Sequence, residues 1–171
     1  MFIQISSCKQ LTTRRNNTVV WIKNRKFHRI GAPAYILHYN NGQIYGYLWY
    51  KYEDRHRICA PAVITYYENG QIESEGWYKD GKLHRSGGAP AIVDYFENGQ
   101  PGKKEWYENG KHHRTGGAPA YITYFGNGQI RCTEWYEHDK LHRPGGAPAY
   151  ITYFENGTIN EKTWYINGIR Q

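Results

Sequence analysis

The chain has 171 residues, with 22 Lys and Arg against 15 Asp and Glu and a formal net charge of +7. Only 39% of the residues are apolar, yet 16% are aromatic, which is typical of a thin, aromatic-rich β-structure rather than a thick aliphatic core. No stretch approaches the roughly 20 apolar residues of a membrane span. The first ten residues also lack the basic start and apolar run of a secretory signal. These features favour a soluble, intracellular protein without a transmembrane segment.

Catalytic and metal-binding patterns are weak throughout the sequence. The three cysteines, Cys8, Cys59 and Cys132, are odd in number and suit neither a disulfide framework nor a zinc pattern. None of the four serines lies in a nucleophile elbow. Equivalent histidines of successive repeats should lie on the order of 10 Å apart, which is far beyond zinc-ligand spacing. We expect no enzyme activity, no cofactor, no metal and no small-molecule substrate.

The tryptophans recur at intervals of 28 or 29 residues, and most other residue types keep the same period. They are Trp21, Trp49, Trp77, Trp106, Trp135 and Trp164. A fixed period of this length indicates a stacked array, in which each unit buries its apolar surface against its neighbours. We expect residues 21–171 to form five repeats plus a partial sixth. Residues 1–20 are then an atypical N-terminal segment, either a cap or a partial repeat.

Two turn signals divide each repeat. Asn-Gly occurs at positions 41–42, 69–70, 98–99, 127–128 and 156–157, between segments rich in Tyr, Ile, Val, Thr and Phe. This pattern predicts antiparallel hairpins with type I′ turns, which need positive φ at both central residues. A weaker turn signal follows each Trp. The later Lys-x-His-Arg segment is either a short third strand or part of a long connection.

The turns predict a register for the whole array. With Asn69 and Gly70 as a two-residue loop, Trp77 faces Ala62, so that a small residue opposes each indole. With a second two-residue loop, Trp77 also faces His84. The same spacing places a histidine against each of the first five indoles, namely His28, His56, His84, His113 and His142. We interpret these histidines as packing residues, and Trp with His as one structural row.

The repeat resembles a known family. Residues 106–114, Trp-Tyr-Glu-Asn-Gly-Lys-His-His-Arg, followed by Tyr-Phe-x-Asn-Gly, are similar to the MORN (membrane occupation and recognition nexus) repeat in its longer variant, found in bacterial and large-DNA-virus proteins. The resemblance covers Trp21 to Arg170. It implies an all-β fold, an elongated single-layer antiparallel β-meander of tandem hairpins that serves as a scaffold. It also implies a viral or bacterial source and, if viral, the host cytoplasm, the nucleus or the virion as the location.

Two functions compete for this sequence. A sheet rich in Tyr and Trp offers rigid contact area, which favours a non-enzymatic scaffold for protein–protein interaction or assembly. The alternative is an anion-binding module for nucleic acid or acidic lipid, whose contacts would be one arginine per repeat, namely Arg29, Arg57, Arg85, Arg114 and Arg143. Against this alternative, Arg114 is expected to oppose Glu105 and Arg143 to oppose Glu134. The basic residues look dispersed except for the pairs Arg14-Arg15 and Lys103-Lys104.

The last strand is a candidate for self-association. An open array ends in an edge strand whose unpaired backbone groups are a template for another chain. Residues Trp164, Tyr165 and Ile166 would form an aromatic, apolar edge there, with little charge nearby. We expect a homodimer joined at this edge on a two-fold axis. The alternative is that the edge binds a different protein.

Overall fold

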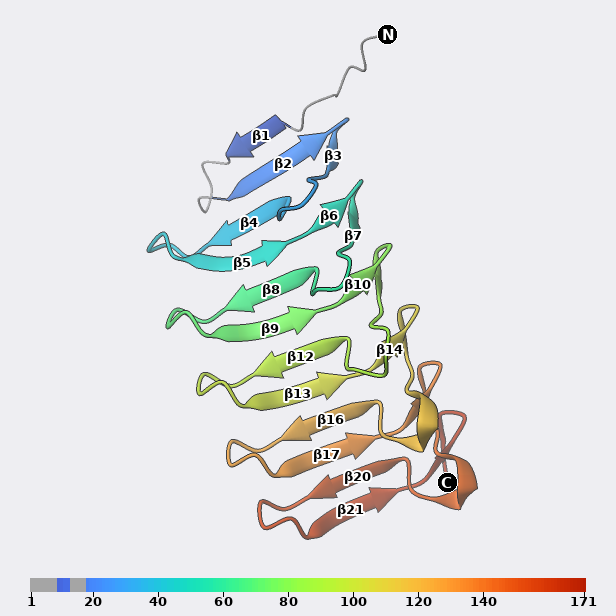
Figure 1. Ribbon diagram of the computed structural model, residues 1–171. Coiled ribbons are helices and arrows are strands. Elements are labelled where there is room, and N and C mark those ends of the chain that lie inside the picture. The colour runs from blue at the N-terminus through green and yellow to red at the C-terminus, as the bar shows by residue number, and fades with distance from the viewer. Residues whose placement is uncertain (1–8, 13–17) are drawn as a thin grey trace.

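The computed structural model describes residues 9–12 and 18–171, and within these ranges it is an elongated, nearly all-β ladder of hairpins (Figure 1). The long strands are β1 (Lys9–Thr12), β2 (Val19–Lys23), β4 (Tyr35–His38), β5 (Ile44–Leu48), β8 (Val63–Tyr66), β9 (Ile72–Gly76), β12 (Ile92–Tyr95), β13 (Pro101–Glu105), β16 (Tyr121–Tyr124), β17 (Ile130–Glu134), β20 (Tyr150–Tyr153) and β21 (Ile159–Thr163). The short strands are β3 (Lys26–Phe27), β6 (Tyr50–Lys51), β7 (Asp54–Arg55), β10 (Tyr78–Lys79), β11 (Lys82–Leu83), β14 (Tyr107–Glu108), β15 (Lys111–His112), β18 (Tyr136–Glu137), β19 (Lys140–Leu141), β22 (Tyr165–Ile166) and β23 (Ile169–Arg170). The two 3-10 turns are η1 (Thr115–Gly117) and η2 (Pro144–Gly146).

The long strands form one antiparallel sheet in which neighbours in sequence are neighbours in space. The path runs from β1 through β2, β4 and β5 to β21, so that two long strands come from each complete repeat. This confirms the predicted β-meander. Strand β1 pairs with β2, which begins at Val19, and residues 1–8 and 13–17 of the expected N-terminal segment lie outside the described residues. Across the described ranges, no helix could span a membrane.

The prediction of type I′ turns at Asn-Gly was wrong, because φ is positive only at the glycine of each pair. In the long hairpin β8–β9 the Gly70 amide donates to the Tyr67 carbonyl at 2.9 Å, and the Asn69 side chain accepts a hydrogen bond from the Gln71 amide. Asparagine therefore serves here through its side-chain oxygen rather than through a left-handed backbone. The glycine alone adopts the left-handed conformation that completes the turn.

The weaker turn signals are the true two-residue hairpins. Both central residues have positive φ in all six, as in the turn made by Asn24 and Arg25 and the turn made by His138 and Asp139. Each turn joins two short antiparallel strands, except that the first joins β2 to β3. The first two residues of Lys-x-His-Arg thus form a short third strand, as in Lys111–His112, whereas His113 and Arg114 lie in the connection that follows it.

A bulge preserves the predicted register along the centre of each hairpin. The Asn-Gly loop is one residue longer than predicted, but the ladder shifts between Thr65 and Tyr66 and leaves Glu73 unpaired. Val63 consequently lies opposite Gly76, as the two-residue loop would have required. The unpaired bulge residues of the five hairpins are Tyr45, Glu73, Gly102, Arg131 and Asn160.

The predicted pairing of each Trp with the Ala of its own hairpin was wrong. The Trp77 amide donates to the carbonyl of Ala91, which directly precedes the next long hairpin, at 2.7 Å, and the Ala62 amide donates to the Gly76 carbonyl. The five alanines at this position are completely buried, namely Ala34, Ala62, Ala91, Ala120 and Ala149. Each Trp–Ala bond therefore joins the end of one long hairpin to the start of the next.

We expect Trp106→Ala to lower the free energy of unfolding by about 3–5 kcal/mol, because the indole is 7% exposed and its loss leaves a cavity. Trp164→Ala is the matched control, because this indole is 43% exposed and its removal should cost less. Chemical denaturation of both variants measures the difference. Equal losses would contradict the assignment of the core to the interior repeats.

Candidate functional site

Each of the first five indoles is covered by an arginine that lies two residues after the short third strand of the same repeat. The guanidinium carbon lies 3.6–3.9 Å from the centre of the indole ring. Nη1 of the same arginine donates to a proline carbonyl at 3.0–3.3 Å. The arginines are Arg29, Arg57, Arg85, Arg114 and Arg143. The predicted pairing with Glu105 and Glu134 was wrong, because cation–π contact with the indole holds these side chains within the fold.

The histidine row joins one repeat to the next instead of packing on the indoles. The backbone pairing of histidine with Trp is as predicted, since the His113 amide donates to the Trp106 carbonyl at 3.1 Å. The side chains turn away: in four repeats, Nδ1 accepts a hydrogen bond from a turn amide of the following repeat at 3.2–3.4 Å. In the remaining repeat the His113 ring stacks on His138. At His56, Nδ1 also lies 3.1 Å from a carboxylate oxygen of Asp80, so that both the amide and the side chain of this turn residue contact the imidazole.

A column of tyrosines was missed by sequence reasoning. A tyrosine directly follows the last five tryptophans, at positions 50, 78, 107, 136 and 165, and this Trp-Tyr pair was the available signal. Residues of the third strands lie between these rings: Arg55 Nη1 donates to the Tyr78 hydroxyl at 3.2 Å, and the His112 ring lies 4.0 Å from Tyr107 and 4.9 Å from Tyr136. These contacts stack the second short hairpin on the third and the fourth on the fifth.

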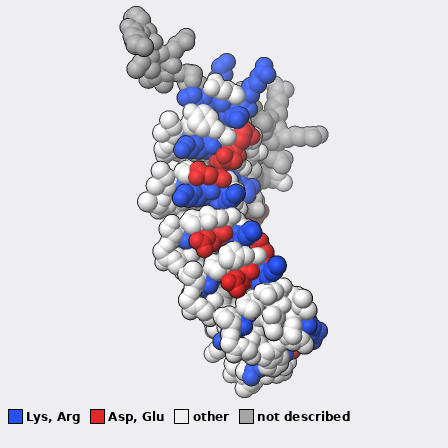
Figure 2. Space-filling model, turned by 90° about the vertical axis from the view of Figure 1, so that its right-hand side faces the viewer, with Lys and Arg blue, Asp and Glu red and all other residues white. Residues whose placement is uncertain are grey.

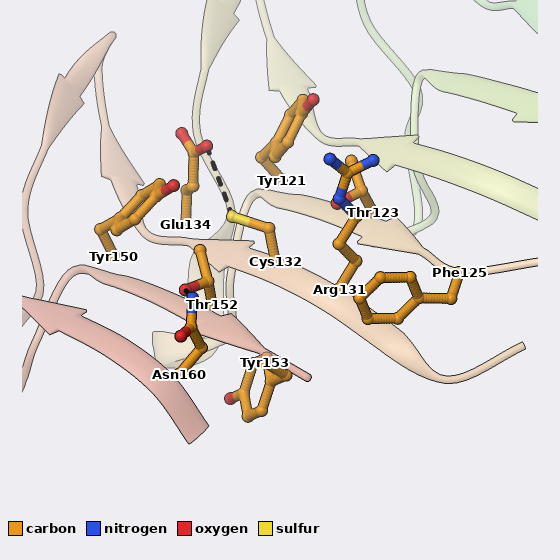
Figure 3. Close-up of a pocket in the computed structure, with 10 residues that line it drawn as sticks. All are labelled: Tyr121, Thr123, Phe125, Arg131, Cys132, Glu134, Tyr150, Thr152, Tyr153 and Asn160. Atoms are coloured by element: carbon orange, nitrogen blue, oxygen red, sulfur yellow. Dashed lines mark hydrogen bonds between the residues drawn. The ribbon is translucent and has the colours of Figure 1, made fainter. Parts of the chain in front are cut away.

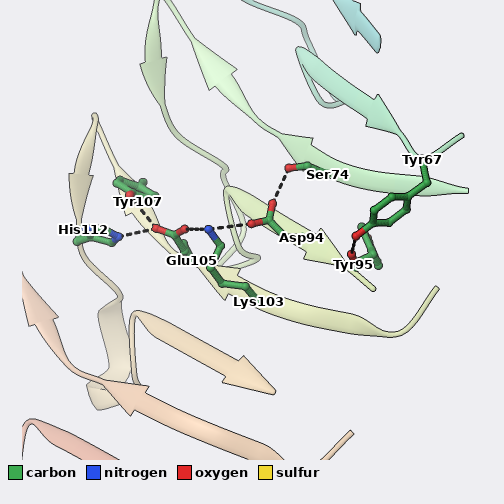
Figure 4. A network of polar contacts seen from close by, with 8 residues as sticks. All are labelled: Tyr67, Ser74, Asp94, Tyr95, Lys103, Glu105, Tyr107 and His112. Atoms are coloured by element: carbon green, nitrogen blue, oxygen red, sulfur yellow. Dashed lines mark hydrogen bonds and ion pairs between the residues drawn. The ribbon is translucent and has the colours of Figure 1, made fainter. Parts of the chain in front are cut away.

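A buried carboxylate lies at the centre of a polar network that joins β13 to the short hairpin β14–β15 (Figure 4). Glu105 is 6% exposed and contacts Lys103 Nζ at 2.7 Å, His112 Nε2 at 2.8 Å and the Tyr107 hydroxyl at 2.8 Å. Burial alone would raise its pKa, but hydrogen bonds from these three groups lower the pKa to about 2. Lys103 also contacts Asp94 at 2.8 Å, and its pKa is raised by the two carboxylates. A carboxylate so fully bonded is a poor general base at neutral pH.

The same face of the sheet carries a groove of about 580 Å³ over β16, β17, β20 and β21 (Figure 3). The cross-strand register places Glu105, Tyr121, Glu134 and Tyr150 in one row on this face. Tyrosine and threonine side chains line the groove, and its two exposed polar residues, Arg131 and Asn160, are bulge residues. A β-bulge can redirect a side chain out of the regular alternation of a strand.

The thiol in this groove is unreactive. Cys132 is buried, and burial together with the negative charge of Glu134 raises the pKa of its thiol to about 12. Because the thiolate is the nucleophilic form, the protonated thiol gives the groove no nucleophile at neutral pH. In the parts of the chain that the structure describes, no group of three or more His, Cys, Asp or Glu could hold a metal ion.

The positive charge is concentrated at one end, contrary to the expectation of dispersal. Residues 1–52 contain eight Lys and Arg and no Asp or Glu, whereas residues 53–171 contain 14 basic and 15 acidic residues. Figure 2 views the side of the array that carries the short hairpins. It shows Lys and Arg gathered at the N-terminal end of this side, and rows of both acidic and basic residues farther along. The array therefore has electrically different ends.

The C-terminal short hairpin is apolar where the N-terminal short hairpin is basic. The prediction that Trp164, Tyr165 and Ile166 form the last edge strand was wrong, because the long sheet ends at β21 and β22 pairs with β23. Trp164 and Ile166 are exposed, but Tyr165 is half-buried and packs on a core cluster that includes Trp135. Ile169, which sequence reasoning missed, is 69% exposed and lies opposite Ile166. All other two-residue turns are flanked by two charged residues. Among the described strands, none pairs with the outer side of β21.

The Glu105 network should make stability depend on pH. Its folded pKa is lowered from 4.5 to about 2, so its stabilisation is complete above pH 4.5 and is lost as the pH falls towards 2. We expect Glu105→Gln to destabilise the protein by about 3 kcal/mol at neutral pH. Urea denaturation across this pH range should show wild type and variant converging in acid, whereas a constant difference would contradict the assignment. Exposed Glu68→Gln is the control.

In comparisons with known proteins, no family model and no curated protein matches this sequence. The established architecture is a repeated β-hairpin meander. It is compatible with a MORN-like repeat fold.

Proposed function

We propose that this chain is a non-enzymatic repeat scaffold that binds a protein partner on the sheet face containing the groove. The observation that carries this proposal is the groove itself, in which rings and hydroxyls from two successive hairpins surround Arg131 and Asn160. Aromatic rings and arginine are the residue types that dominate binding energy at protein interfaces. The groove continues towards the third hairpin, where a second depression shares Thr123, Phe125 and Arg131.

The chemistry of this face supports a binding role rather than catalysis. The Glu105 carboxylate has three internal partners, and the Cys132 thiol is protonated at neutral pH. An activated nucleophile needs a lowered pKa or an adjacent base within hydrogen-bond reach. The groove presents hydroxyls, an amide and a guanidinium, which suit recognition of an extended protein segment.

The alternative of anion binding through the once-per-repeat arginines is not favoured. Each guanidinium covers an indole and donates to a proline carbonyl, so ligand binding would compete with the packing of that repeat. We further propose that the repeats are the long MORN variant, in an intracellular protein of bacterial or viral origin. The support is the recurrence of Trp, His and Asn-Gly on hairpins of the matching architecture.

We also propose that the scaffold forms a homodimer through its C-terminal edge. Trp164, Ile166 and Ile169 expose apolar surface there, and the outer backbone groups of β21 have no partner strand among the described residues. Burial of aliphatic side chains contributes about 25 cal/mol for each Å² removed from water. A second copy supplies the same apolar groups by two-fold symmetry.

The partner proposal is tested by affinity capture from the native source with nuclease treatment. We expect a specific protein to be retained by the wild type and lost with Arg131→Ala/Asn160→Ala, because both side chains lie in the groove. The control is Tyr45→Ala/Glu73→Ala, which changes the same bulge positions in the first two hairpins. Loss of the partner on nuclease treatment, or equal retention by both variants, would refute the proposal.

The dimer proposal is tested by light scattering at micromolar concentration. We expect a dimer for the wild type and a monomer for Ile166→Glu/Ile169→Lys, which creates the charged pair seen at Glu137 and Lys140 and so suits the hairpin fold. Ile30→Ser removes another exposed isoleucine and should leave the dimer intact. A monomeric wild type, or a dimer that survives the double change, contradicts this interface.

A further inference from the structure

The first short hairpin is strongly basic and carries no acidic residue. Lys23, Arg25 and Lys26 occupy three of its four turn positions, and Lys23 lies directly opposite Lys26. Like charges placed opposite each other destabilise a strand pair. None of the three forms an ion pair with any carboxylate in the described part of the chain. The repulsion is therefore retained without internal compensation.

The neighbouring hairpins differ in this respect. Lys51 lies opposite Asp54 in the second hairpin, and Glu108 lies opposite Lys111 in the fourth. Lys79 and Lys82 also oppose each other in the third, but Asp80 lies in the turn between them. The basic character of the first hairpin is consequently a departure from the repeat, and an external anion would relieve it.

Next to this hairpin, the turn of the second hairpin presents an exposed aromatic ring. Tyr52 adopts φ +53°, although the other turns have Asn, Asp or His at this position. Positive φ is unfavourable for a bulky residue, and such strain often accompanies a functional position. The ring stacks on His28, with centroids 4.1 Å apart and an interplanar angle of 14°, yet Tyr52 remains 45% exposed. The His28 ring thus covers one face of the Tyr52 ring, while part of the Tyr52 ring remains exposed to solvent.

The lysines of both hairpins act on this aromatic pair. The pKa of His28 is lowered by burial and then by the positive charges of Lys23 and Lys51. Glu53 accepts a hydrogen bond from the Phe27 amide and Asp54 faces Lys51, and both keep their negative charge. The turns of the two short hairpins, with the residues that flank them, hold four basic residues, Lys23, Arg25, Lys26 and Lys51, against these two acidic ones, so the surroundings of Tyr52 carry a net positive charge.

We propose that this N-terminal surface, formed by Lys23, Arg25, Lys26, Lys51 and Tyr52, binds single-stranded nucleic acid. The lysines and the arginine contact phosphates, and a base stacks on the open face of Tyr52. Single-strand binding sites combine cationic groups along the backbone with aromatic side chains on which bases stack. This activity is independent of the groove proposed for a protein partner, because it uses the first two repeats and the hairpin side of the array.

The charge contribution is tested by fluorescence anisotropy with labelled single-stranded DNA and RNA of about 20 nucleotides, longer than a typical single-strand site. The variant is Lys23→Gln/Arg25→Gly/Lys26→Gln, whose Asn-Gly turn matches that of the fourth and sixth repeats. We expect at least tenfold weaker binding, and a salt dependence whose log–log slope falls by about 2.

The matched control is Lys82→Gln/Lys111→Gln/Lys140→Gln, which removes the same charge from the equivalent strand of three later hairpins. It should bind like the wild type within a factor of about three, because a localised site depends on contacts rather than on net charge. Equal losses in the two triple variants would overturn the localised site.

The stacking contribution is tested by Tyr52→Asn, which restores the residue type found in three other turns and should preserve the fold. We expect about tenfold weaker binding, and retained binding in Tyr52→Phe, because stacking uses the ring and not the hydroxyl. An unchanged affinity of Tyr52→Asn would overturn the role of Tyr52.

An acidic membrane is the competing anion, because Ile30 and Ile58 are exposed in the loops of the first two repeats. Sedimentation with phosphatidylserine-containing vesicles separates the two ligands. We expect the oligonucleotide to bind in physiological salt and the vesicles not to. Vesicle binding that is lost in Ile30→Ser/Ile58→Ser, without oligonucleotide binding, would replace this proposal with a lipid surface.

Discussion

Backbone pairing between successive repeats is the constraint on which this structure depends. A single-layer sheet has no second layer to cover it, so every repeat must bury its apolar groups against its neighbours. The amide of Trp77 bonds to the carbonyl of Ala91 at the start of the next long hairpin, and the completely buried alanine leaves the two backbones in close contact. Arg85 then covers the exposed side of the indole and is fixed by the Pro90 carbonyl. Tryptophan, alanine, arginine and proline therefore recur together for one packing reason.

The short hairpins form a second column of contacts beside the sheet. Their turns bond to the preceding repeat, as when the Gly81 amide donates to the Arg55 carbonyl at 3.0 Å. Histidine Nδ1 accepts a second bond from the same turns, for example from Asp80 to His56. This column holds the repeats together at the ends of the long strands. It also places the turn residues on an outer surface, where they can change without disturbing the sheet.

The array is specialised at its turns and not at the contacts between its repeats. The residues inside the repeat contacts hardly change, whereas the turn flanks change from basic in the first hairpin to apolar in the sixth. On the sheet face, a groove occurs where the bulge position holds Arg131 and Asn160. A basic end, a groove and an apolar edge thus lie along one array at different repeats. Such separation of surfaces suits a scaffold that holds several partners.

The sequence by itself determined the repeat, the hairpins and the central register. Period, turn residues and alternation are local properties, so Val63 could be placed opposite Gly76 before the structure was known. The predicted register is correct because two departures from the prediction cancel. The Asn-Gly loop is one residue longer than predicted, and the bulge at Glu73 shifts the register back by one residue. The two-residue turns occur after each Trp and not at the Asn-Gly pairs. Asn69 shows the reason, because asparagine can complete a turn through its side chain as readily as through its backbone.

Only the tertiary structure decided which side chains meet between repeats. Arginine and histidine are adjacent in sequence, and alternation alone put histidine on the indole, yet Arg114 stacks on Trp106 while His113 stacks on His138. The loop after the third strand bends the chain, and alternation no longer applies beyond a strand's end. The groove and the ring of Tyr52 over His28 likewise join residues of different repeats. Such contacts depend on how successive units stack, which a single repeat does not encode.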